Sequence, residues 1–275
     1  MRRRVLELLK IAGVAVVGVV LAMSVFQERL IFLRQPAGLA PRPPPGGVLE
    51  RVQLRASDGA QLAGWLVRHS ASASPLLIYF GGNAEEVSWI VSQRFAGWSV
   101  LAINYRGYGD SEGEPGEAVL FRDAVDIYDY AVSRNDVDRS RIAIMGRSLG
   151  SGVAVHLAAH RPVAGVLLAA PFDSLEKVAA RIYPFLPVRW MLRHRFDSSA
   201  LAPALKVPAL FIVAERDSII HPDHARRLHE LWGGAKQWVE LRGADHNDFD
   251  GRPEFWDAID AFLRSLAMPA EGGRR

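Results

Sequence analysis

The sequence of 275 residues contains no cysteine. This absence excludes disulfide bonds, zinc sites built from thiolates and a cysteine nucleophile, although it does not identify a cellular compartment. Net charge is low as well, at +3, and much of the positive excess lies at the two ends of the chain. Because nucleic-acid binding needs a concentrated basic surface, we expect no nucleic-acid partner. Internal repeats and long low-complexity segments are also lacking.

An uncharged, apolar run extends over residues 11–26, behind a basic N-terminus. Its length is near the lower limit for a bilayer-spanning helix, and Val5–Leu9 can extend it by a turn. We therefore expect a membrane anchor over 1–34, with a signal-anchor helix at about 8–26. A cleaved signal peptide, which would leave the protein secreted, and a buried globular helix are the alternatives. The basic residues before the run predict a cytoplasmic N-terminus, with the rest of the chain on the periplasmic or extracytoplasmic side.

The segment 35–47 is rich in proline and is predicted to be a stiff linker. Residues 48–268 alternate short apolar runs with helical runs, which is typical of an α/β domain, and 269–275 form a tail. A hairpin is expected at the start of the domain, with its turn at Ser57-Asp58-Gly59. Strands are predicted at Val48–Arg55, Gln61–Val67, Pro75–Phe80, Trp98–Asn104, Arg141–Met145, Val163–Ala170, Val207–Ala214 and Gln237–Leu241. Helices are predicted at Glu85–Phe95, Ala118–Ser133, Ser151–His160, Asp223–Trp232 and Pro253–Leu266. The result is a doubly wound, mostly parallel sheet of about eight strands.

The pattern Gly146-Arg-Ser148-Leu-Gly150 lies between a predicted strand and a predicted helix. This context is the one that a nucleophile elbow, G-x-S-x-G, requires. The sharp turn presents the serine hydroxyl at the carboxyl end of the sheet, and the flanking glycines leave room around it. We therefore expect Ser148 to be a nucleophile.

A serine nucleophile needs a base and a carboxylate that orients the base. Asp217 directly follows one predicted strand, and His246 lies in the loop after the last strand. The order Ser148, Asp217, His246 is that of α/β hydrolases, and each residue comes just past a strand. Asp173 and Asp245 are alternatives for the acid. His221 and His224 have the spacing of a metal pair, but no third ligand is spaced to join them, so neither a metal nor a cofactor is expected.

An oxyanion formed during acyl transfer needs two backbone N–H donors. One is expected from Leu149, directly after the predicted nucleophile, and the other from Asn83 in the loop after Phe80. Gly81 and Gly82 in this loop allow the close approach that such a pocket demands, so we expect them to contact the substrate.

With these residues placed, the chain resembles the Bem46-like, ABHD-type branch of the serine α/β-hydrolases over roughly residues 48–268. The motifs that carry the resemblance are Phe80-Gly-Gly-Asn-Ala84, Asn104-Tyr-Arg-Gly-Tyr-Gly-Asp-Ser-Glu-Gly113, Gly146-Arg-Ser-Leu-Gly150, Pro171-Phe-Asp-Ser174, Glu215-Arg-Asp217 and Asp245-His-Asn-Asp248. The segment Gln27-Glu-Arg-Leu-Ile-Phe32 is similar to the one that follows the anchor in membrane-bound members. The resemblance implies the α/β-hydrolase fold and serine hydrolase activity. Two positions depart from the pattern, since the family usually has histidine at 81 and glycine at 151.

Residues 172–205 break the regular alternation of predicted strands and helices, and we expect them to form a small helical cap. The cap mixes apolar residues with arginines, among them Arg189 and Arg193. We expect these arginines to bind an anionic head group next to an acyl chain, with a solvated helical pair as the alternative. The predicted function is hydrolysis of carboxylic esters or thioesters, with lipid or acyl substrates, through an acyl-enzyme. Peptidase, acyltransferase and a catalytically silent, membrane-tethered scaffold are the alternatives, because one fold hosts many functions.

Overall fold

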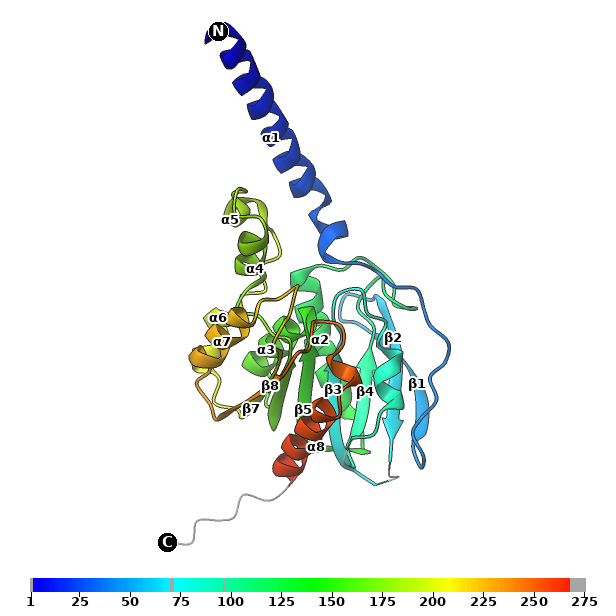
Figure 1. Ribbon diagram of the computed structural model, residues 1–275. Coiled ribbons are helices and arrows are strands. Elements are labelled where there is room, and N and C mark those ends of the chain that lie inside the picture. The colour runs from blue at the N-terminus through cyan, green and yellow to red at the C-terminus, as the bar shows by residue number, and fades with distance from the viewer. Residues whose placement is uncertain (1, 70–71, 96, 268–275) are drawn as a thin grey trace.

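The structure, a computed structural model, describes residues 2–69, 72–95 and 97–267 (Figure 1). Its centre is one sheet of eight strands in the order β1-β2-β4-β3-β5-β6-β7-β8. The strands are β1 Val48–Arg55, β2 Gln61–Arg68, β3 Ser74–Phe80, β4 Ser99–Ile103, β5 Val137–Arg147, β6 Gly165–Ala169, β7 Ala209–Ala214 and β8 Lys236–Leu241. The pairs β1–β2 and β2–β4 are antiparallel, and the other neighbours are parallel. The predicted mostly parallel, eight-stranded sheet is therefore confirmed. The predicted tail 269–275 lies outside the described residues.

Apolar side chains alternate between the two faces of the sheet and give each face its own core. Along β3, Ile78 and Phe80 pack in one core and Leu77 and Tyr79 in the other. The first core is covered by α2 Glu117–Ser133, α3 Leu149–His160 and α7 Pro222–Leu231, and the second by the 3₁₀ helix η1 Val87–Ser92 and α8 Pro253–Ala267. Burial on both faces explains why the inner strands β3, β4, β6 and β7 are short, almost wholly apolar runs. The carboxyl ends of the parallel strands meet at one edge, which is where the site lies.

The helix predicted at Glu85–Phe95 is present only as the short 3₁₀ helix η1. The N-cap residue Glu86 accepts a hydrogen bond from the Ser88 backbone N–H, and η1 ends at Ser92. The segment contains the β-branched residues Val87, Ile90 and Val91, which are buried against the sheet. Such residues have restricted rotamers in an α-helix, so the tertiary contacts outweigh a weak helical preference.

The N-terminal residues form one helix, α1 Arg2–Ile31, which ends shortly before Pro36. Over the residues that the structure describes, no helix is both long enough and apolar enough to cross a membrane. A membrane-spanning helix at about 8–26 therefore stays a prediction. The segment after α1 lies against the α/β domain, where Pro36 forms a β-bridge with Gly109.

Residues 172–205 form a helical excursion between β6 and β7. It consists of α4 Leu175–Ile182, α5 Val188–Met191, α6 Ser198–Leu201 and the 3₁₀ helix η2 Ala202–Ala204. Figure 1 shows α4 and α5 projecting from the same end of the molecule as α1. The remaining short helix, η3 Phe249–Gly251, follows the loop after β8. Three segments far apart in the sequence thus meet above one edge of the sheet: α1, the α4–α5 excursion and the loops that follow the strands.

Candidate active site

Ser148 lies in the sharp turn between β5 and α3. Its backbone adopts φ 50° and ψ −117°, a strained conformation for a residue with a side chain. A Cβ at Gly146 would lie 2.2 Å from the Gly150 carbonyl oxygen, and one at Gly150 would lie 2.1 Å from the Phe80 carbonyl oxygen. Both positions therefore require glycine, and the pattern Gly146-Arg-Ser-Leu-Gly150 is fixed by backbone packing around the turn.

The structure brings Ser148, His246 and Asp217 into one hydrogen-bonded line. His246 Nε2 lies 3.0 Å from Ser148 Oγ, and His246 Nδ1 lies 2.8 Å from Asp217 Oδ2. Because a carboxylate can only accept, Nδ1 carries the proton and Nε2 of the neutral imidazole is free to accept from the serine hydroxyl. Asp217 Oδ1 also accepts from the backbone N–H groups of Ile219 and Ile220 at 3.0 and 2.7 Å. These bonds fix the carboxylate, so the line has the geometry of a Ser-His-Asp triad.

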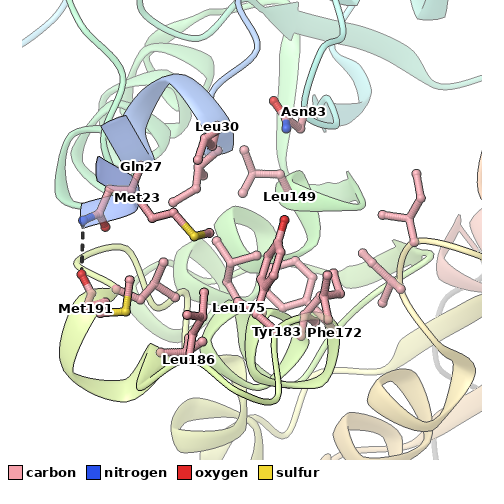
Figure 2. Close-up of a pocket in the computed structure, with 18 of the residues that line it drawn as sticks. Met23, Gln27, Leu30, Asn83, Leu149, Phe172, Leu175, Tyr183, Leu186 and Met191 are labelled. Atoms are coloured by element: carbon pink, nitrogen blue, oxygen red, sulfur yellow. Dashed lines mark hydrogen bonds between the residues drawn. The ribbon is translucent and has the colours of Figure 1, made fainter. Parts of the chain in front are cut away.

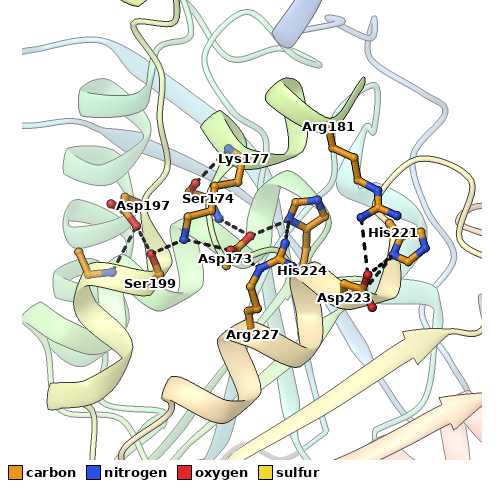
Figure 3. A network of polar contacts seen from close by, with 11 residues as sticks. Asp173, Ser174, Lys177, Arg181, Asp197, Ser199, His221, Asp223, His224 and Arg227 are labelled. Atoms are coloured by element: carbon orange, nitrogen blue, oxygen red, sulfur yellow. Dashed lines mark hydrogen bonds and ion pairs between the residues drawn. The ribbon is translucent and has the colours of Figure 1, made fainter. Parts of the chain in front are cut away.

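The two alternative acids have other partners. Asp173 is fully buried and lies 2.7 Å from His224 Nδ1, while Arg227 Nε donates to it across 2.9 Å and Lys177 Nζ lies 3.1 Å away (Figure 3). Burial alone would raise the pKa of Asp173, but hydrogen bonds from these cationic and imidazole groups outweigh burial and hold the pKa well below its ordinary value. Asp173 thus joins the base of the excursion to α7 and does not contact His246.

Asp245 supports the loop of the predicted base. Its Oδ1 accepts from the backbone N–H groups of Ser218 and His246, both at 2.7 Å, and its Oδ2 accepts from the Ser218 hydroxyl. These hydrogen bonds, from Ser218 first and then from His246, lower the pKa of Asp245. Because Ser218 follows Asp217 directly, the carboxylate of Asp245 ties the loop of Asp217 to the loop of His246.

Asn83 and Leu149, the predicted oxyanion donors, line the same cavity as Ser148. Leu149 is the first residue of α3, so its N–H belongs to the helical donors that have no partner within the helix. The Asn83 side chain is engaged elsewhere, since its Oδ1 accepts from the backbone N–H groups of Leu33 and Ala84 at 2.8 and 2.9 Å. The side chain therefore anchors the loop, and the backbone N–H is the part of Asn83 suited to an oxyanion.

Gly81 and Gly82 let this loop pack closely against η1 and Ser148. A Cβ at Gly81 would lie 2.8 Å from Val87 Cγ1, so the histidine usual in the family could not fit here without moving η1. A Cβ at Gly82 would lie 3.5 Å from Ser148 Cβ, which places this glycine directly against the predicted nucleophile. The other departure, Ser151, is buried, and its hydroxyl donates to the Ser148 carbonyl oxygen at 2.7 Å. Ser151 therefore braces the elbow.

Glu85, a buried carboxylate that its sequence context does not mark, lies behind the oxyanion loop. Its Oε1 accepts from the Tyr79 hydroxyl and from Trp89 Nε1, and its Oε2 accepts from the Gly82 backbone N–H at 2.7 Å. Arg147 Nη1 donates to the same oxygen at 3.0 Å. The carboxylate thus fixes the oxyanion loop to the residue that precedes Ser148. Its only sequence signal is an acidic residue two positions after Asn83.

Arg147 continues this network to the loop of His246. Burial alone would lower the pKa of its guanidinium, but the charge of Glu85 outweighs this effect and the pKa is raised. The guanidinium carbon lies 5.2 Å from the ring centroid of Phe249, and Nη2 lies 3.4 Å from the His246 carbonyl oxygen. One cation therefore contacts the oxyanion loop, the elbow and the His246 loop.

Ser148 and Leu149 line an apolar cavity of about 290 Å³. Figure 2 shows side chains of its walls, with Leu149 among those labelled. Its walls come from α1, from the α4–α5 excursion and from the loop after β7. The lining residues are Met23, Gln27, Leu30, Ile31, Asn83, Ser148, Leu149, Phe172, Leu175, Val178, Ala179, Ile182, Tyr183, Leu186, Val188, Met191, Leu192, Ile219 and Ile220. Arg189 and Arg193, which were predicted to bind substrate, are exposed and do not line this cavity.

The histidines of α7 have structural surroundings. His221 caps the helix, and its Nδ1 lies 3.2 Å from Asp223, while His224 is buried next to Asp173 (Figure 3). Within residues 2–69, 72–95 and 97–267, no group of three or more histidine, aspartate or glutamate side chains is arranged to hold a metal ion.

The chain is similar to known proteins along most of its length. The family profile for serine aminopeptidase, S33, matches residues 91–201. An uncharacterized protein of Mycobacterium tuberculosis, Rv2307c, is 35% identical, with 97% of this chain and 98% of that protein covered. The α/β hydrolase domain-containing protein WAV2 of Arabidopsis thaliana is 28% identical over 93% of this chain and 92% of its own. The uncharacterized membrane protein YNL320W of Saccharomyces cerevisiae is 31% identical over 78% of this chain and 79% of its own.

Among solved structures, the acetyl xylan esterase from Paenibacillus sp. R4 has a similar fold. The TM-score is 0.67 at 21% identity, and the match covers 80% of this chain and 84% of that chain. At this level of identity the likeness shows a shared α/β-hydrolase fold, as the sequence analysis expected.

Proposed function

The chain belongs to the α/β-hydrolase family related to Bem46, WAV2 and YNL320W and is a serine hydrolase, and from this premise we propose that it cleaves carboxylic esters or thioesters of acyl or lipid substrates. The observation that carries the proposal is the position of Ser148. Its hydroxyl is hydrogen-bonded to His246, and the residue lines the apolar cavity. An apolar cavity suits an acyl chain, because burial of each methylene group is favourable.

In the proposed reaction, Ser148 Oγ attacks the carbonyl carbon of the substrate while its proton passes to His246 Nε2. Asp217 holds the imidazole and stabilises the imidazolium. The N–H groups of Asn83 and Leu149 stabilise the negative charge on the carbonyl oxygen. His246 then gives the proton to the leaving alcohol or thiol, which leaves an acyl ester on Ser148. Water, deprotonated by His246, attacks this ester, and His246 returns the proton to Ser148 Oγ as the acid is released.

The cavity favours this proposal over a peptidase or an acyltransferase. A peptidase must pair the amide groups of its substrate, yet most of the lining side chains are hydrocarbon. The test is to compare p-nitrophenyl octanoate, octanoyl-coenzyme A and octanoyl-amino-acid amides as substrates of the full-length protein. Rapid release of octanoate from the ester or thioester is expected. Cleavage of the amides at a comparable kcat/KM would favour the peptidase, and transfer of the acyl group to an added alcohol in preference to water would favour the acyltransferase.

We also propose that the protein works at a membrane. The excursion exposes large apolar side chains at its tip, since Phe185 is 96% and Trp190 87% exposed. Arg189 lies next to Trp190, and no carboxylate among the described residues forms an ion pair with it, so it is available to anionic head groups. Arg193 has a different setting, because Nη2 donates to the Ser24 carbonyl oxygen and Nη1 lies 3.6 Å from Glu28.

Flotation with vesicles of phosphatidylcholine, with and without phosphatidylglycerol, tests this second proposal. The wild type is expected to float, more strongly with the anionic lipid, and Arg189→Ala should reduce that preference. Wild type that stays at the bottom of the gradient with both vesicles would contradict it. Resistance to extraction by alkaline carbonate would favour the predicted anchor, with the N-terminus cytoplasmic and the catalytic body across the membrane.

A further inference from the structure

The C-terminal turns of α1 are part of the wall of the active-site cavity. Met23, Gln27, Leu30 and Ile31 line the cavity that Ser148 also lines. Side chains of α4 and α5 supply the facing wall (Figure 2). The end of α1 thus lies between solvent and the space next to the predicted nucleophile. A substrate that fills this space must contact α1.

Gln27 fixes the distance between the two walls. Its side chain is only 6% exposed, and Nε2 donates to the carbonyl oxygens of Met191 at 3.1 Å and Ser24 at 2.8 Å. Its Oε1 accepts from the backbone N–H of Arg193 at 2.8 Å. This buried amide holds the main chain of α1 and that of the excursion at a fixed separation. Breaking any of its bonds would leave a buried polar group unpaired.

The segment directly after α1 is joined to the catalytic loops. Phe32 is buried and packs edge-on against His194, with ring centroids 5.1 Å apart. The next backbone N–H, that of Leu33, donates to Asn83 Oδ1 in the oxyanion loop. The wall formed by α1 is therefore anchored at one end to the excursion and at the other to the loop that is proposed to stabilise the oxyanion.

These contacts lead to an inference that rests on the proposed function. We propose that Met23–Ile31 of α1 selects the length of the substrate's acyl chain, and that the preferred substrate carries one chain of medium length. A water molecule occupies about 30 Å³ in the liquid and a methylene group is of similar size, so the cavity holds on the order of ten methylene groups. Longer chains must displace α1 or leave part of the chain in water.

The experiment measures kcat/KM of the full-length protein in detergent for p-nitrophenyl acetate, octanoate, decanoate and palmitate. For the wild type, kcat/KM is expected to rise from acetate to a maximum at octanoate or decanoate and to fall at palmitate. Met23→Trp adds the volume of about two methylene groups to the wall, and each methylene that no longer fits forfeits about fourfold in preference. The ratio of decanoate to acetate should therefore fall about fifteenfold.

Val25→Trp is the matched control, because Val25 is on the same helix, is 65% exposed and does not line the cavity. Its profile should match that of the wild type. A second variant, Gln27→Ala, loosens the wall and should reduce the discrimination between decanoate and palmitate by about fivefold, the worth of one hydrogen bond. Each variant is also labelled with a fluorophosphonate to measure its active fraction.

Two failures are distinguishable. If all proteins are labelled and hydrolyse the esters, but Met23→Trp and Gln27→Ala keep the chain-length profile of Val25→Trp, α1 does not select the acyl chain and the proposed function stands. If the folded wild type is neither labelled nor active on any of the esters, the proposed function itself fails.

Discussion

Arg147 Nη1 donates to Glu85 Oε2 across 3.0 Å, directly behind the turn that carries Ser148. Glu85 is buried and Arg147 largely so, and neither residue lines the cavity. Glu85 holds the Gly82 N–H, and Arg147 reaches the carbonyl oxygen of His246. A single ion pair therefore sets the position of the oxyanion loop relative to the predicted base.

Glu85→Gln should lower kcat for ester hydrolysis about tenfold with little change in KM. The amide keeps the size of the side chain but leaves the buried cation of Arg147 without its charge partner, and the Gly82–Asn83 loop shifts. Complete loss of one oxyanion donor costs about 10²–10³ in rate, so a shift of the loop should cost less. Steady-state kinetics on p-nitrophenyl octanoate provide the measurement. Glu86→Gln, the same change one residue on, is the control and should retain wild-type kcat, whereas equal losses in both variants would refute the role of Glu85.

Asp217→Asn should lower kcat about 10⁴-fold, because an amide no longer selects the imidazole tautomer with its proton on Nδ1. Thermal unfolding should change little, since Oδ1 can still accept from the N–H groups of Ile219 and Ile220. The measurement is kcat of purified protein alongside its melting temperature. Retention of more than a tenth of the activity would mean that another carboxylate orients His246.

Asp173→Asn should instead lower the free energy of unfolding by about 3 kcal/mol at neutral pH, because it removes the negatively charged acceptor of a buried network. The folded-state pKa of Asp173 is depressed, so its contribution is present above the ordinary pKa of about 3.9 and is lost as the pH falls below it. The difference in free energy of unfolding between wild type and variant should therefore be constant from pH 7 to about pH 5 and shrink in more acidic solution. Urea titrations at several pH values give this difference. A difference that grows on acidification would contradict the assignment.

Gly146→Ala should destabilise the fold by about 3 kcal/mol or prevent soluble expression, because the new Cβ would overlap the backbone of α3. Gly251→Ala is the matched change, since a Cβ there meets nothing within 4 Å. Urea unfolding of both variants checks the prediction. A Gly146→Ala protein as stable as Gly251→Ala would show that the elbow can open, and the argument for a fixed Ser148 conformation would fail.

Local patterns in the sequence predict the sheet and the positions of the three triad residues. Short extended runs, most of them apolar, identify the strands, and Ser148, Asp217 and His246 each follow such a run, so a parallel sheet must bring their loops to one edge. The resemblance to the Bem46-like hydrolases is confirmed by the relatives. These features depend on residues close together in the sequence, so they can be recognised without knowledge of tertiary contacts.

Features that depend on contacts distant in the sequence were not predicted. Glu85 and Arg147 are 62 positions apart, and a lone glutamate after a glycine loop carries no mark of its buried partner. The same holds for Gln27 and Met191, which are 164 positions apart, so the contact between α1 and the excursion was not predicted. The short η1 has a similar cause, because burial of its β-branched residues outweighs the local helical pattern.

Labelling of the full-length, detergent-solubilised protein with a fluorophosphonate, wild type next to Ser148→Ala, tests the central claim most directly. The reagent reacts with a serine that a neighbouring base has activated. The structure predicts labelling of the wild type and its complete loss in Ser148→Ala, with unchanged melting temperature. Equal labelling of the two proteins would place the reactive serine elsewhere, and no labelling of a folded wild type would contradict an activated Ser148.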